Sequence, residues 1–336
     1  MGGAGLQFAF SPFRLPWCGI AARNLLMGMP ANPLQWSIGL VGYGEVGRIL
    51  AEDLRTRGVE NVLAYDIKFG TDADAPLLAH AAQHGVRPMS GHAFLARAAD
   101  LVISAVTADQ TLAVAVSSAP TLAPGTWFLD VNSASPGAKI EAAGLIDGAG
   151  GRYVEGAVMT SVPPHRIRVP LLLGGKAATE LAPLLELLGF APKVASERLG
   201  VASATKMCRS VMIKGLESMV IESFTAARSH GVEDAVIASL YETFPGIDWE
   251  KQGSYFFQRV IEHGRRRAEE MREVAQTVRE AGLTPWSAAG SAERDAWMAE
   301  LADGGVFGDR AAPDFARRPD WRTEADRIIA AMRTKA

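Results

Sequence analysis

Cysteine is scarce in this chain of 336 residues, which has only Cys18 and Cys208. These two residues form no C-x-x-C pair, so they offer neither a disulfide framework nor a thiolate metal site. The six histidines are scattered, with no H-E-x-x-H or similar motif to bring imidazoles together on one helix face. The sequence therefore predicts no metal, and the low cysteine content fits a reducing cytoplasm.

An excess of positive charge is absent as well. The chain carries 34 Lys and Arg residues against 37 Asp and Glu residues, which gives a formal net charge of -3. Such a chain has no positive field with which to attract a phosphate polymer or an anionic lipid surface. We therefore expect no nucleic-acid partner.

Long uninterrupted apolar runs are also missing. In residues 1–36 the apolar patches are broken by Arg14, Arg23 and several prolines, so none is long enough to span a bilayer. Arg14 also follows the first apolar patch, whereas a secretory signal begins with its positive charge. We expect no membrane association, and we treat residues 1–35 as an N-terminal extension without function, either disordered or an artefact of an upstream start.

The rest of the chain has the composition of a globular protein, with 48% hydrophobic and 21% charged residues. From Ser37 onward, short aliphatic runs alternate with alanine-rich helical stretches, a pattern typical of β-α-β units that build a parallel sheet. The expected strands are Ser37–Val41, Asn61–Tyr65, Leu101–Val106, Thr126–Val131, Arg152–Val158 and Pro170–Leu173, and the expected helices between them include Val46–Arg57, Ala75–His84, Gly91–Ala98 and Pro136–Ile146.

After about Ser196 the strand signals end and only helical patterns follow. The predicted fold is an α/β Rossmann domain with a doubly wound, mostly parallel sheet over residues 36–196, followed by an all-helical domain over residues 197–336. Its expected helices are Val201–His230, Val232–Thr243, Gly253–Glu280, Ser291–Asp303 and Trp321–Arg333.

A glycine-rich loop lies between the first strand and the first helix. Its residues are Gly42, Tyr43, Gly44, Glu45, Val46 and Gly47, which match G-x-G-x-x-G. In this position the glycines permit a tight turn, a close approach of backbone to a pyrophosphate, and packing of helix on strand, while free N–H groups at the helix start bind the anion. A glycine triplet alone also fits an ordinary strand-to-helix turn.

Asp66 strengthens the prediction of dinucleotide binding. It ends the second strand about 19 residues beyond Gly47, where a carboxylate accepts hydrogen bonds from the adenosine ribose. The same carboxylate repels a 2'-phosphate, so we expect NAD as the cofactor. The nearby Lys68 leaves NADP possible, and Asp66 also fits a turn before Gly70.

Lys206 lies on the long helix that follows the sheet. With about 100° per residue, Ser203, Lys206, Ser210, Lys214 and Glu217 share a polar face, and we expect Ala204, Cys208, Met212, Gly215 and Met219 on a packed face. A lysine close to a bound substrate can exchange a proton with its oxygen if burial lowers the lysine pKa. The alternative is a solvated face on which Lys206 serves only solubility.

Three segments resemble the β-hydroxyacid dehydrogenase superfamily, which includes 3-hydroxyisobutyrate and 6-phosphogluconate dehydrogenases. They are Ile38–Gly47 for the cofactor loop, Asp130–Pro136 for the substrate loop, and Gly200–Lys206 for the catalytic helix. The resemblance extends from Ser37 to about Pro285. It implies a Rossmann domain followed by an all-helical domain through which two copies form a homodimer.

By this resemblance Lys206 takes the position of the general acid/base. Asn132 and Ser133 take the positions that bind a substrate carboxylate, and Val106 and Thr107 those that contact the nicotinamide ribose. The substrate loop has a second interpretation, because a serine before a proline also caps a helix N-terminus.

Some residues depart from the family pattern. Ser210 replaces the usual asparagine four residues after the lysine, and residues 159–165 replace a glycine-rich stretch. We expect Arg209, Ser210 and Lys214 to contribute to a rebuilt substrate site. This part of the helix resembles a branch with a phosphogluconate-dehydrogenase-like C-terminal domain.

A cationic cluster further along includes His263 and Arg266. It either forms a solvated helix face paired with Glu269, Glu270 and Glu273 or binds an anionic group of the substrate.

The leading hypothesis is an NAD(P)-dependent dehydrogenase that acts on the CH–OH group of a small anionic hydroxy acid or related alcohol, with or without decarboxylation. Imine reductases of the same superfamily are one alternative, although they commonly lack the lysine. A catalytically silent dinucleotide-binding protein is another.

Overall fold

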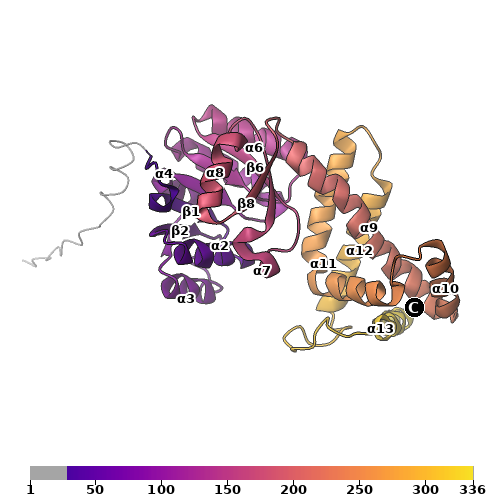
Figure 1. The fold of residues 1–336 in the computed structure, drawn as a ribbon. Helices are drawn as coiled ribbons and strands as arrows, with labels where there is room; N and C mark the ends of the chain where they lie inside the picture. Colours follow the sequence, from indigo (N-terminus) through magenta and orange to yellow (C-terminus); the bar gives the residue numbers. More distant parts are fainter. Residues whose placement is uncertain (1–28, 336) are drawn as a thin grey trace, which may run out of the picture.

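The computed structural model describes residues 29–335, so the predicted N-terminal extension lies largely outside the described residues. An eight-stranded sheet is flanked by helices on both faces, and a separate group of helices follows it (Figure 1). This arrangement confirms the predicted fold class. Among residues 29–335, no helix is long and apolar enough to cross a bilayer.

The sheet has the strand order β3-β2-β1-β4-β5-β6-β7-β8. All neighbouring strands are parallel except β6 and β7, which pair antiparallel. The two edge strands, β3 and β8, were not predicted from the sequence, because β3 has only two residues and β8 is half-exposed without a clear alternation. The strands are β1 (Ser37–Val41), β2 (Asn61–Tyr65), β3 (Arg87–Pro88), β4 (Leu101–Ser104), β5 (Trp127–Asp130), β6 (Arg152–Val158), β7 (Pro170–Gly174) and β8 (Ala191–Ser196).

Helices and short 3-10 turns connect these strands. The reversal of strand order between β1 and β4 opens a crevice at the carboxyl ends of the strands, where doubly wound sheets bind their ligands. The α-helices are α2 (Glu45–Thr56), α3 (Ala75–Gln83), α4 (His92–Ala98), α5 (Thr111–Ser118), α6 (Pro136–Gly148), α7 (Val162–His165) and α8 (Ala178–Leu188). The 3-10 turns are η1 (Pro33–Gln35), η2 (Ala108–Gln110), η3 (Ala119–Thr121) and η4 (Arg166–Arg168).

The remaining chain is helical, as predicted. The first of these helices, α9, runs from beside the sheet into the helical group (Figure 1). The helices are α9 (Val201–His230), α10 (Glu233–Thr243), α11 (Trp249–Glu280), α12 (Trp286–Asp303) and α13 (Trp321–Lys335).

Helix α11 begins at Trp249, four residues before the predicted start at Gly253. The Asp248 side chain caps the helix by accepting a hydrogen bond from the Lys251 N–H group. Gly253 therefore does not end a loop. It lets α11 approach α9, because a Cβ atom there would lie 2.7 Å from the ring of Phe224.

The expected faces of α9 are wrong in part. Met212 and Met219 are 71% and 60% exposed, and Cys208 is exposed too, whereas Ser203 and Glu217 are buried. The polar side of α9 is the packed side because its partners, on β6, α11 and α12, are themselves polar.

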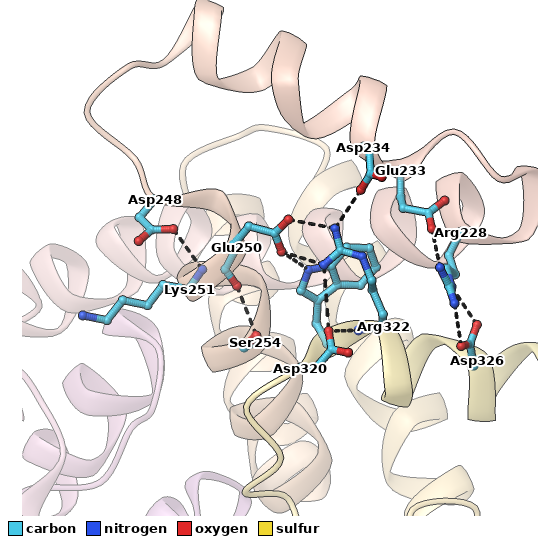
Figure 2. A network of polar contacts seen from close by, with 11 residues as sticks. Arg228, Glu233, Asp234, Asp248, Glu250, Lys251, Ser254, Asp320, Arg322 and Asp326 are labelled. Atoms are coloured by element: carbon cyan, nitrogen blue, oxygen red, sulfur yellow. Dashed lines mark hydrogen bonds and ion pairs between the residues drawn. The ribbon is translucent and has the colours of Figure 1, made fainter.

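Ion pairs hold the C-terminal helix α13 against the other helices (Figure 2). Arg322 binds Glu250 of α11 at 2.8 Å and Asp234 of α10 at 2.9 Å. Arg228 of α9 binds Asp326 at 2.8 Å. The helical group is therefore held together by these ion pairs on α13 and by the apolar core around Phe257 and Trp321.

Candidate active site

The glycine-rich loop has the backbone geometry that its motif predicts. Gly42 has a φ of +92°, and a Cβ atom there would lie 2.4 Å from the carbonyl oxygen of Ala105. A Cβ atom on Gly47 would lie 2.1 Å from the Gly42 carbonyl oxygen, so this glycine lets α2 pack on β1. Beside Gly44, in contrast, the part of the chain that the structure describes leaves open space. The loop therefore fits the pyrophosphate of a dinucleotide.

Asp66 is buried at the end of β2, next to the loop. Its carboxylate accepts hydrogen bonds from the N–H groups of Tyr43, at 2.7 Å, and Lys68, at 3.0 Å. It thus fixes the loop and borders the cavity in which an adenosine ribose would lie.

A cavity of about 640 Å³ extends from Asp66 to the helical group. It brings together most of the site residues that the sequence predicted. Those that line it are Gly42, Gly44, Glu45, Val46, Asp66, Val106, Thr107, Asn132, Ser133, Lys206, Arg209, Ser210, Lys214 and Arg266. Three predicted residues lie outside the described lining, namely Tyr43, Gly47 and His263.

Tyr43 packs beneath the loop instead. Its ring is buried, and burial raises the pKa of its hydroxyl to about 12. The hydroxyl is 2.9 Å from Nδ1 of His80, whose Nε2 is 2.9 Å from Glu52. His80 also stacks on His84, so the expectation that no two imidazoles share a helix face is wrong. The cause is their spacing of four residues on α3.

Lys206 lies at the centre of the cavity, where α9 passes the substrate loop. Its Nζ atom donates a hydrogen bond of 2.5 Å to the hydroxyl of Ser133. Burial lowers the pKa of Lys206 to about 8; the charge of Glu270 opposes this change and that of Lys214 adds to it. An ammonium with this pKa can lose and regain a proton near neutral pH.

A group of paired charges surrounds Lys206 on the helical side. Glu270 of α11 forms ion pairs with Lys214 and with Arg266, the latter at 3.1 Å. Burial alone would raise the pKa of Glu270, but Lys214, Arg266 and Lys206 lower it to about 2. Glu270 is therefore ionised at any pH at which the protein would work.

Glu155 holds the first turn of α9 in place. This buried residue of β6 accepts hydrogen bonds from the Ala202 N–H group, at 3.0 Å, and the Ser203 hydroxyl, at 2.9 Å. The carboxylate caps the helix N-terminus and is favoured there by the helix dipole. It positions the turn that carries Lys206.

Asn132 lines the cavity, but its side-chain amide is bonded to the end of the sheet. Its side-chain oxygen accepts a hydrogen bond of 2.7 Å from the Val106 N–H group, and its amide donates one of 2.9 Å to Ser104. The side chain thereby connects the substrate loop to the end of β4. Ser133 is left to present its hydroxyl to Lys206.

Below the loop, Asp130 and Lys139 form a buried ion pair at 2.7 Å. Asp130 also accepts hydrogen bonds from the Tyr153 hydroxyl, at 2.7 Å, and from the Asn132 N–H group, at 2.9 Å. Ser135 caps α6, as the second interpretation of the loop predicted.

Two glutamates of α11 reach across to the N-terminus of α6. Glu273 accepts from the Ser135 N–H group at 2.7 Å, and Glu280 accepts from the Gly137 N–H group at 2.9 Å. These contacts fix α11 of the helical group to the start of α6.

Five further lining residues on α11 were not among the predicted site residues, namely Tyr255, Arg259, Arg267, Glu269 and Glu270. Three of them, with Arg266, lie within about 60° of one another on the helix, at positions 255, 259, 266 and 270. This spacing was the available signal, but the sequence does not say which face of α11 meets the sheet.

Two family models match the chain. Residues 37–191 match the NAD binding domain of 6-phosphogluconate dehydrogenase, and residues 227–298 match a domain of unknown function, DUF1932. The first match covers the glycine-rich loop, Asp66 and the substrate loop.

Solved structures of other proteins are similar to the chain, among them the following three. A conserved hypothetical protein from Sinorhizobium meliloti is 38% identical, with 86% of this chain and 96% of that one covered and a TM-score of 0.66. A 3-hydroxyisobutyrate dehydrogenase from Mycobacterium tuberculosis is 18% identical, with 88% of this chain and 99% of that one covered and a TM-score of 0.65. An imine reductase from Myxococcus stipitatus, in complex with NAD+, is 16% identical, with 88% and 99% covered and a TM-score of 0.51. The last two show a shared fold.

Proposed function

Because this chain belongs to the β-hydroxyacid dehydrogenase superfamily, in the branch that joins the NAD-binding domain of 6-phosphogluconate dehydrogenase to DUF1932, we propose that it oxidises a hydroxy acid or related alcohol and that Lys206 acts as the general acid/base. The observation that carries the proposal is the hydrogen bond between Lys206 and Ser133 in the cavity that the glycine-rich loop also lines.

The bound nicotinamide supplies the hydride acceptor or donor, and the protein handles the proton. In the oxidation direction, neutral Lys206 takes the proton from the substrate hydroxyl; in reduction, the ammonium returns it to the carbonyl oxygen. Ser133 orients the lysine through its hydroxyl. Backbone N–H groups of the substrate loop, with Arg209 at the cavity rim, favour a substrate carboxylate.

Asp66 supports NAD rather than NADP as the preferred cofactor, since a 2'-phosphate beside its carboxylate would be repelled. Fluorescence titration should show tighter binding of NADH than of NADPH. Equal or reversed affinity would refute this role of Asp66.

A homodimer through the helical domain is a further part of the proposal. Met212 and Met219 lie seven residues apart on α9 and are both largely exposed, so they present an apolar strip outside the cavity. A cytoplasmic location stays a prediction from the cysteine content.

The activity is tested by screening hydroxy acids for reduction of NAD+ and NADP+. For any active substrate, Lys206→Met should lower kcat by at least about a hundredfold, the scale of general acid–base catalysis, while the Kd of NADH stays unchanged. Lys176→Met, at an exposed lysine in the loop before α8, is the control and should retain full activity.

Two results would point elsewhere. Turnover of imines but not of hydroxy acids would support an imine reductase. Cofactor binding without any turnover, unaffected by Lys206→Met, would support a silent dinucleotide-binding protein.

A further inference from the structure

Arg259 of α11 lacks a partner on the wall of the cavity. Its Nε atom is buried without a hydrogen bond, and among residues 29–335 its guanidinium forms no ion pair. A guanidinium that is buried in part and unpaired loses hydration without compensation unless a ligand provides an anion. An anionic group that enters the cavity would supply the missing partner.

The neighbouring cations on the same wall already have carboxylate partners. Lys214 and Arg266 share Glu270, and Arg267 pairs with Glu217. Arg209 has no such partner within the described chain, but it lies on α9, one turn from Lys206, at the substrate end of the cavity. Arg259 lies eleven residues before Glu270, so the helix rise of 1.5 Å per residue places it about 16 Å along α11 from the Lys206 region.

The N-terminus of α2 borders the same cavity as Arg259. Gly44, the N-cap residue of α2, and Glu45, its first residue, line the cavity together with Arg259. The charges of Arg259 and Glu45 both affect the pKa of His263, one turn beyond Arg259, although burial is the main cause of its lowering. The Arg259 segment of α11 and the N-terminus of α2 therefore border one continuous space.

A cation opposite the N-terminus of α2 would add a charge-assisted contact to a pyrophosphate bound there. Gly44 is the N-cap residue, and in the described structure no side chain caps this end, so its N–H groups remain available to an anion. The loop itself contributes an acid, Glu45, whose charge repels a diphosphate. Arg48 lies in the next turn, where its Nε donates to the Gly44 carbonyl.

We propose that Arg259 binds the pyrophosphate of the dinucleotide from across the cavity, so that the helical domain completes the cofactor site. The guanidinium and the N–H groups of α2 then hold the diphosphate from opposite sides. The ligand class is a dinucleotide diphosphate, and the contact is charge-assisted. Cofactor binding would thereby connect α11 to the sheet domain, as Glu273 and Glu280 do through their contacts with the start of α6.

The test is a set of binding measurements that need no turnover. Arg259→Gln should weaken NADH and ADP-ribose by at least about tenfold, the scale of a hydrogen bond to a charged group, and should leave the affinity for adenosine, which has no phosphate, unchanged. Arg259→Lys should recover part of the loss. The matched control is Arg272→Gln, at an exposed arginine of the same helix outside the cavity lining, which should bind all three ligands normally.

Circular dichroism and thermal unfolding of each variant separate loss of the contact from loss of the fold. A folded Arg259→Gln variant with unchanged NADH and ADP-ribose affinity would overturn the proposal. So would a variant in which only the KM of the acid substrate rises, because the arginine would then hold a substrate anion instead.

Discussion

The buried carboxylate of Glu155 accepts a hydrogen bond of 2.9 Å from the hydroxyl of Ser203, which joins the middle of β6 to the first turn of α9. The same carboxylate accepts from the Ala202 N–H group. Lys206 lies one turn further along α9, so the direction of its side chain depends on this cap.

We expect Glu155→Gln to destabilise the protein by about 1–3 kcal/mol, because the amide leaves part of the buried capping pattern unsatisfied. It should also lower kcat while the Kd of NADH stays unchanged. Urea unfolding and steady-state kinetics measure the two effects. Ser203→Ala removes one of the two bonds and should have a smaller effect on both; an equal or larger effect would contradict the capping role of Glu155.

The second prediction concerns pH. Burial lowers the pKa of Lys206 to about 8, and oxidation of an alcohol requires the neutral amine. The kcat/KM for oxidation should therefore rise with pH and level off above about 8, while that for carbonyl reduction, which requires the ammonium, should fall through the same range. Initial rates from pH 6 to 10 in both directions test this. An oxidation rate that stays constant between pH 7 and 9 would remove Lys206 from the proton transfer.

The third prediction uses the charges beside Lys206. Glu270 raises the pKa of Lys206 and Lys214 lowers it. Glu270→Gln should therefore move the inflection of the pH–rate profile to lower pH, and Lys214→Met should move it to higher pH. Two shifts in the same direction would show that the substitutions act through a change of structure rather than through charge.

Oligomeric state gives the fourth prediction. Replacing Met212 and Met219 together by glutamate should disrupt a homodimer, because two like charges from each copy would meet in the proposed interface. Light scattering after gel filtration measures the mass. Leu187→Glu, on the exposed side of α8, is the control and should leave the mass unchanged. A wild-type protein that is monomeric at all concentrations would refute the proposed interface.

The local part of the site was predictable from the sequence. The glycine-rich loop and Lys206 each lie in one continuous segment of the sequence. The spacing of the glycines predicts the turn before α2, and the helical periodicity predicts the helix that carries Lys206. Glu155 was not found, and Glu270 was named only as a partner of the cationic cluster, because each acts on α9 from an element 47 or more residues away in the chain.

The faces of α9 show the same limit. Periodicity separates a polar face from an apolar one, but burial depends on what packs against each. Here the packed side meets Glu155, Arg267 and Asp295. Ser203, Ser210 and Glu217 are therefore buried, whereas Met212 and Met219 are exposed. Only the assembled fold supplies that information.

The buried pair of Asp130 and Lys139 provides the last prediction. Both side chains are 1% exposed, so neither charge has access to water when its partner is removed. Lys139→Met should therefore destabilise the protein by about 3–5 kcal/mol, since it leaves the Asp130 carboxylate buried beside the Tyr153 hydroxyl without a cation. Adding Asp130→Asn to this variant removes the uncompensated charge and should restore much of the lost stability. Urea unfolding of the two single variants and the double variant measures the coupling between them. If the loss of unfolding free energy in the double variant equalled the sum of the losses in the two single variants, the ion pair would make no contribution of its own to the support of the substrate loop.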